Sequence, residues 1–207
     1  MNILVIAPHP DDEAIGCGGA LCLHTQKGDR VTAVFLTSGE LGLKKLPREE
    51  AWKIREAEAR RAGDILGLSE LHFLRQPDWT LGEHTSKSAE LLQPILKREK
   101  PDLVYLPHPL EQHPDHQTAL PIVREAIKRS GIHLPKLRGY EVWTPLNSFD
   151  EVQDISAVMI RKLRAVRAHR SQMGEYNYTR AVRGLNAYRG ALAAKSCFAE
   201  IFQILEV

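Results

Sequence analysis

Short apolar runs alternate along the chain with longer segments in which apolar residues recur at helical spacing. The short runs are rich in Val, Ile, Leu and aromatic residues, which favours buried strands. They predict strands at residues 2–7, 30–37, 71–74, 102–107, 140–143 and 200–206. The longer segments predict helices at residues 13–27, 48–66, 88–97, 118–129, 156–170 and 180–195. This alternation is typical of an α/β domain built on a mostly parallel sheet.

The expected fold is therefore a Rossmann-like three-layer sandwich, in which helices cover both faces of a mostly parallel sheet. A chain of 207 residues fits one hydrophobic core, so we expect a single domain over residues 1–207. Gly28 and Gly67 directly follow two predicted helices, at the position where a left-handed residue commonly ends a helix.

The composition indicates which binding partners and which cellular compartment to expect. The chain has 28 Lys and Arg against 26 Asp and Glu, and this net charge of +2 gives no electrostatic reason to expect nucleic acid. No apolar run approaches the roughly 20 residues of a membrane helix, and the first residues resemble a strand rather than a signal peptide. Cys17, Cys22 and Cys197 form no CxxC pair, which favours a reducing compartment. We expect a cytoplasmic protein that binds neither nucleic acid nor membrane.

Residues that carry chemistry follow the first predicted strand. His9, Asp11, Asp12 and Glu13 lie between that strand and a helix, at the strand end where open α/β sheets bind ligands. A structural explanation also exists, because Asp11 or Asp12 could cap the helix. This cluster alone does not decide between the two interpretations.

A second cluster follows the strand predicted at residues 102–107. It contains His108, Glu111, His113, Asp115 and His116, and it emerges at the same edge of the sheet. Together the two clusters supply the nitrogen and oxygen ligands of a catalytic zinc site, which commonly keeps a fourth position for water. The residues alone indicate metal-assisted hydrolysis. A metal-dependent phosphoesterase and a catalytically silent sugar- or nucleotide-binding module are the alternatives.

Two motifs resemble a known family. APHPDDE at residues 7–13 resembles the signature of the PIG-L/LmbE-type N-acetylglucosaminyl deacetylases, and HPDH at residues 113–116 resembles their second motif. The resemblance extends through residues 37–40, 55–58, 169–172 and 189–190, and so covers almost the whole chain. It implies zinc-dependent removal of an acetyl group from a small N-acetylglucosamine-containing molecule, such as a glucosamine conjugate of a thiol pathway or a chitin-type sugar. It also implies a homo-oligomer.

The resemblance further implies a role for individual residues. It makes His9, Asp12 and His116 the zinc ligands and Asp11 the general base. A protonated His113 would stabilise the anionic intermediate of the reaction. Because His113 and His116 lie three residues apart, spacing does not settle which of them is the ligand.

Two residues outside these motifs are candidates for contact with the sugar. The resemblance implies that Arg55 contacts sugar hydroxyls. Glu40, in the loop after the second predicted strand, is a candidate for the same contact. The structural alternative for Arg55 is a solvated helix face, because residues 48–61 mix acidic and basic side chains as an ordinary surface helix does.

Overall fold

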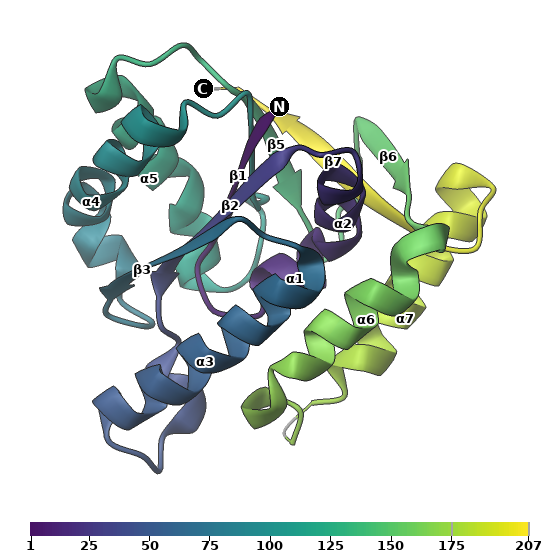
Figure 1. The fold of residues 1–207 in the computed structure, drawn as a ribbon, viewed down its shortest axis with the longest axis horizontal. Coiled ribbons are helices and arrows are strands. Elements are labelled where there is room, and N and C mark those ends of the chain that lie inside the picture. Colours follow the sequence, from purple (N-terminus) through teal and green to yellow (C-terminus); the bar gives the residue numbers. More distant parts are fainter. Residues whose placement is uncertain (175, 207) are drawn as a thin grey trace.

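A mostly parallel sheet forms the centre of the molecule (Figure 1). The computed structural model describes residues 1–174 and 176–206. Within them the sheet has the strand order β3-β2-β1-β4-β5-β7-β6, in which β7 pairs antiparallel with β5 and β6 and the other pairs are parallel. The strands are β1 (Asn2–Ala7), β2 (Arg30–Thr37), β3 (Glu70–Gln76), β4 (Leu103–Pro107), β5 (Lys136–Tyr140), β6 (Glu151–Asp154) and β7 (Ala199–Leu205).

Helices cover both faces of this sheet (Figure 1). One face carries α4 (Thr85–Glu99) and α5 (Pro114–Ser130). The other carries α1 (Asp12–Gly16), α2 (Gly18–Gln26), α3 (Arg48–Leu66), α6 (Met159–Ala168) and α7 (Tyr178–Arg189). Short helical turns lie at η1 (Glu40–Leu43), η2 (Leu81–His84), η3 (Ser156–Val158), η4 (Arg170–Gln172) and η5 (Gly190–Ala194). The predicted three-layer α/β fold is confirmed. Among the described residues, no helix is both long enough and apolar enough to cross a membrane.

The central strands are apolar on both faces because each face packs against helices. In β1, Ile3 and Val5 belong to the core under α2, α3 and α6, whereas Leu4 and Ile6 belong to the core under α4 and α5. A parallel strand buried on both sides is a continuous apolar run, which is the pattern that the first residues of the chain display.

Several predicted elements have other bounds in the structure, and two of the differences matter for the site. The strand predicted at residues 140–143 lies instead at Lys136–Tyr140, and the residues after Tyr140 leave the sheet as a turn. The helix predicted at residues 13–27 is broken at Cys17 into α1 and α2. The break coincides with the buried carboxylate of Glu200, which accepts the N–H groups of Gly19 and Ala20 and so caps α2 from a distant strand.

The strand order places both motifs at one point. β1 lies between β2 and β4, where the chain order reverses, and the carboxyl ends of β1 and β4 carry the HPDD and HPDH segments. Ligands of open α/β sheets bind in the crevice at such a reversal. The fold therefore brings residues more than one hundred positions apart into one site.

Candidate active site

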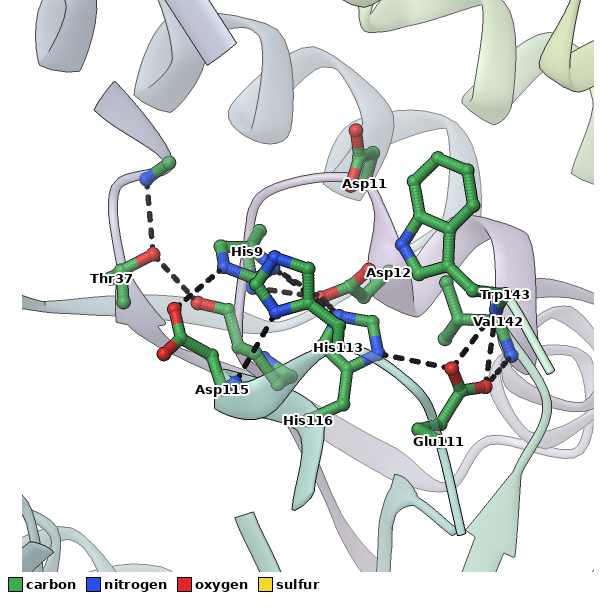
Figure 2. A network of polar contacts seen from close by, with 12 residues as sticks. His9, Asp11, Asp12, Thr37, Glu111, His113, Asp115, His116, Val142 and Trp143 are labelled. Carbon is green, nitrogen blue, oxygen red and sulfur yellow. Dashed lines mark hydrogen bonds and ion pairs between the residues drawn. The ribbon is translucent and has the colours of Figure 1, made fainter. Parts of the chain in front are cut away.

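Three ligand-type atoms converge where β1 and β4 end. His9 Nδ1 lies 3.3 Å from Asp12 Oδ2, His116 Nε2 lies 3.3 Å from the same oxygen, and the two nitrogens lie 3.3 Å apart. Asp12 is oriented by the His9 backbone N–H, which it accepts at 2.8 Å. Burial alone would raise the pKa of Asp12, but the two imidazoles hold it well below its usual value. The carboxylate is therefore ionised between two imidazole nitrogens (Figure 2).

This triangle has the dimensions of a metal site. Tetrahedral zinc with bonds of about 2.0–2.1 Å holds its ligand atoms about 3.3 Å apart. Without an ion, at most one proton can lie between the two facing nitrogens. The donor set of two imidazoles and one carboxylate also matches catalytic zinc sites, which use three protein ligands. The residues therefore fit a zinc ion.

The far side of the His9 ring faces two more carboxylates. Nε2 lies 3.1 Å from Asp115 Oδ2 and 3.1 Å from Asp78 Oδ1. Asp115 also accepts the N–H groups of Trp79 and Leu81, so it joins the ring to the loop before η2. A carboxylate on the second nitrogen fixes the tautomer and orientation of a metal-binding histidine. Asp115 belongs to the second cluster of the sequence, whereas Asp78 lies outside both clusters.

His113 lies beside the triangle but points differently from His116. Its Nδ1 accepts the Asp115 N–H at 3.2 Å and so caps α5. A ring nitrogen of His113 still lies within 4.8 Å of ligand atoms of His9 and His116. Burial and the neighbouring His9 and His116 lower the pKa of His113 to about 4. This lowered pKa favours the neutral ring, and the Asp115 N–H on Nδ1 then leaves the proton of His113 on Nε2. Protonation of His113 during a reaction stays a prediction.

Asp11 stands next to the triangle without being part of it. Its backbone has φ of 125°, a region that side-chain-bearing residues rarely adopt, and such strain concentrates at functional sites. Its N–H donates to Glu13 Oε2, and Arg55 Nη2 donates to Asp11 Oδ2 at 3.1 Å and to the Pro10 carbonyl. Burial raises the pKa of Asp11 to about 6, and Arg55 acts in the opposite direction. The carboxylate is poised to exchange a proton near neutral pH.

The contact of Glu13 with His169 was not predicted. The His169 ring is buried, and its Nε2 lies 3.4 Å from Glu13 Oε1. Glu13 thereby connects His169 to the strained backbone of Asp11. The signal in the sequence was the segment at residues 169–172 that resembles the family, although its partner could not be inferred from it.

The two candidate sugar-binding residues differ in position. Arg55 is buried, contacts Asp11 and lines the cavity described below. Glu40 is buried too, but its carboxylate accepts from Trp52 Nε1, pairs with Arg48 and faces the Asp78 N–H. As the described residues form it, the cavity wall does not include Glu40. Contact of Glu40 with a sugar stays a prediction.

A cavity of about 230 Å³ opens over these groups. His9, Asp11, Asp12 and His113 line it together with aromatic side chains and with Leu41, Gly42, Lys44, Arg55, Asp78 and Gln172. Trp143 forms edge contacts with Tyr176 and Tyr178, at ring-centroid distances of 5.8 and 5.5 Å, and Trp79 lies 4.7 Å from His113. The aromatic residues that line the cavity are Trp79, Trp143, Tyr176 and Tyr178. Aromatic faces beside polar groups suit a sugar ring, which has both apolar and hydroxyl faces.

Solved structures of other proteins share this fold. A solved structure described as a 4-carboxy-2-hydroxymuconate hydratase from Pseudomonas putida KT2440 superposes with a TM-score of 0.84 at 22% identity, covering 100% of this chain and 97% of that one. That likeness shows the fold alone. An N,N'-diacetylchitobiose deacetylase from Pyrococcus horikoshii superposes with a TM-score of 0.85 at 26% identity, covering 98% and 83%.

Similarity in sequence identifies the family as well as the fold. A diacetylchitobiose deacetylase from Thermococcus kodakarensis is 32% identical over 193 residues, which span 84% of this chain and 71% of the relative. The family model described as PIG-L, GlcNAc-PI de-N-acetylase, matches residues 4–127 and so includes both histidine motifs. The chain belongs to the PIG-L family.

Proposed function

We propose that this protein is a zinc-dependent deacetylase that hydrolyses the acetamide of a small N-acetylglucosamine-containing molecule. The observation that carries the proposal is the triangle of ligand atoms, 3.3 Å on each side, next to a carboxylate outside it. A metal beside a free carboxylate is the arrangement that amide hydrolysis requires. Membership of the PIG-L family and the names of the deacetylase relatives support the choice of an N-acetyl sugar.

We assign zinc to His9, Asp12 and His116. Bound there, zinc would lower the pKa of a coordinated water to about 7 and polarise the acetyl carbonyl. Asp11 then acts as the general base, since its carboxylate borders the triangle and its pKa of about 6 leaves it mostly ionised at neutral pH. Arg55 holds that carboxylate in place.

His113 donates a hydrogen bond where negative charge develops. Because its Nδ1 accepts the Asp115 N–H, the ring carries its proton on Nε2 and serves as a neutral donor to the oxyanion. The proton that Asp11 has taken is then available to the departing amine. The cavity's aromatic wall holds the sugar ring while this exchange occurs.

The test is acetate and free-amine release from N-acetylglucosamine, N,N'-diacetylchitobiose and an N-acetylglucosaminide with an acidic aglycone. We expect the zinc-loaded protein to deacetylate at least one of them. Asp11→Asn should keep one zinc per chain and lose turnover by roughly 10²–10⁴-fold. Full activity of Asp11→Asn would refute the base assignment.

No acetate from any compound, with zinc bound, would contradict the proposed reaction. Phosphate release from a phosphomonoester with two metals per chain would favour the phosphoesterase instead, and hydration of an unsaturated acid would favour the chemistry of the hydratase with the same fold.

We also propose a cytoplasmic homo-oligomer. Three free cysteines, two of them buried, support the reducing compartment. Exposed Ile160 in α6 and exposed Leu192 in η5 support the assembly. Sedimentation analysis of the zinc-loaded protein tests the assembly, and a monomer at micromolar concentration would contradict it.

A further inference from the structure

Glu111 is a buried carboxylate that holds a turn on the far side of the site. It lies between β4 and α5 and is 0% exposed. Its side chain accepts the successive backbone N–H groups of Val142, Trp143 and Thr144, at 2.7, 3.1 and 3.2 Å (Figure 2). These bonds explain why the chain leaves the sheet after Tyr140. They also place Trp143 at the cavity wall.

The same carboxylate faces the second histidine of the triangle. Glu111 Oε2 lies 3.5 Å from His116 Nδ1, a buried atom that has no hydrogen-bond partner among the described residues. When Nε2 of His116 binds the proposed zinc, the ring must carry its proton on Nδ1. Glu111 is the acceptor toward which that proton points.

The charge of Glu111 distinguishes this role from a purely structural one. Three backbone N–H groups could be satisfied by a neutral amide oxygen or by water at a lower desolvation cost. Within the described residues, the carboxylate contacts those N–H groups, His116 Nδ1 and His108 Nε2 at 3.4 Å, and no Lys or Arg. A buried negative charge without a cationic side chain is stabilised when the facing imidazole binds a cation.

Asp115 shows the same arrangement on the other side of the site. It contacts His9 Nε2 and accepts the N–H groups of Trp79 and Leu81, as Glu111 contacts His116 and accepts those of the Trp143 turn. Each histidine of the triangle thus shares a buried carboxylate with a loop that carries a tryptophan of the cavity wall.

We propose that Glu111 is a positioning residue with two arms, one that orients His116 for the metal and one that fixes Trp143 against the substrate. The first arm rests on the proposed zinc site. Both metal affinity and substrate affinity then depend on this one side chain, although it touches neither ligand. Sequence pattern assigned it no role beyond membership of a histidine-rich loop.

The experiment compares Glu111→Gln with Glu141→Gln. Glu141 is also buried, accepts the Leu146 N–H and pairs with Arg189, but among the described residues it pairs with no histidine. For each variant we would measure thermal stability, the zinc dissociation constant by chelator competition, the visible spectrum of the cobalt-substituted protein, and kcat and KM.

We expect Glu111→Gln to lose roughly 10- to 100-fold in zinc affinity, to alter the cobalt spectrum and to raise KM. Glu141→Gln should lose stability with zinc affinity within about two-fold of wild type. Trp143→Ala should raise KM alone. Unchanged zinc affinity and cobalt spectrum in a folded Glu111→Gln would overturn the first arm, and an unchanged KM would overturn the second.

A wild-type protein that binds no zinc would instead contradict the proposed function, so the two failures are distinguishable. If Glu111→Gln does not fold, nitrogen-15 NMR of the zinc-loaded wild type decides the first arm. We expect a slowly exchanging, downfield proton on His116 Nδ1, as for a ring N–H bound to a carboxylate. An unprotonated Nδ1, or one that exchanges as fast as in an exposed histidine, would refute it.

Discussion

The guanidinium of Arg55 lies against the carboxylate of Asp11, with Nη2 and Oδ2 3.1 Å apart. The same guanidinium donates to the carbonyls of Gly39 and Pro10, so it is held on several sides. Burial raises the pKa of Asp11, and the positive charge of Arg55 limits that rise. The pair therefore sets the pH at which the proposed base becomes available.

Replacing Arg55 with Met should shift the acidic limb of the pH–kcat profile to higher pH. A general base acts only when ionised, so wild-type activity should fall as pH drops through about 6. Loss of the neighbouring cation raises the pKa of Asp11 by roughly one unit or more, and kcat at pH 7 falls accordingly. Arg75→Met, which removes a guanidinium bound to Glu56 instead, is the control. If Arg55 served only the sugar, KM would rise and the acidic limb would stay in place.

Separate substitutions of the two HPDH histidines should distinguish zinc binding by one from stabilisation of the oxyanion by the other. His116→Ala should lose most bound zinc, because its Nε2 is a corner of the triangle. His113→Ala should keep zinc and lose roughly 10²-fold in kcat, because it removes a donor to the oxyanion. Metal analysis after dialysis, together with steady-state kinetics, measures both. If His113→Ala lost zinc and His116→Ala kept it, His113 would be the metal ligand and His116 the donor to the oxyanion.

Asp115→Asn should weaken zinc binding through His9. Its carboxylate faces His9 Nε2 and fixes the loop of Trp79, so zinc affinity should fall roughly 10- to 100-fold. Asp102→Asn is a matched control, since Asp102 accepts the Asn2 N–H at the opposite end of β1. Chelator competition on both proteins is the measurement. Equal zinc affinity in the two variants would argue against this role.

Lys162→Met should lower stability and leave the site intact. Lys162 Nζ lies 2.7 Å from Glu200 Oε1, and both side chains are almost fully buried. Removing the lysine leaves the Glu200 carboxylate buried without its cation, which costs about 3 kcal/mol in the free energy of unfolding. Urea titration measures it, and zinc affinity should not change. The double variant Lys162→Met with Glu200→Gln should recover part of the lost free energy of unfolding. A further loss of equal size would show that the unpaired Glu200 carboxylate does not cause the destabilisation.

Much of the fold and the location of the site follow from local pattern. The two clusters with the histidine motifs follow apolar runs, and parallel strands with helices on both faces must bury such runs completely. Carboxyl ends of neighbouring parallel strands share one edge, so the convergence of the two clusters was predictable. The choice of His9, Asp12 and His116 as ligands came from the family resemblance. The elements that were misjudged are those governed by distant partners, such as the turn after Tyr140 and the break at Cys17.

By itself, therefore, the sequence determined the three-layer architecture and the kinds of groups that meet at the edge of the sheet. The tertiary structure decided how these groups are held and charged: Arg55 against Asp11, His169 against Glu13, Glu111 between His116 and the Trp143 turn. It also placed His113 between two neighbouring imidazoles in a buried site, which lowers its pKa. Periodicity reports which face of an element is apolar, but a buried side chain's partners and pKa depend on which distant loops pack against it.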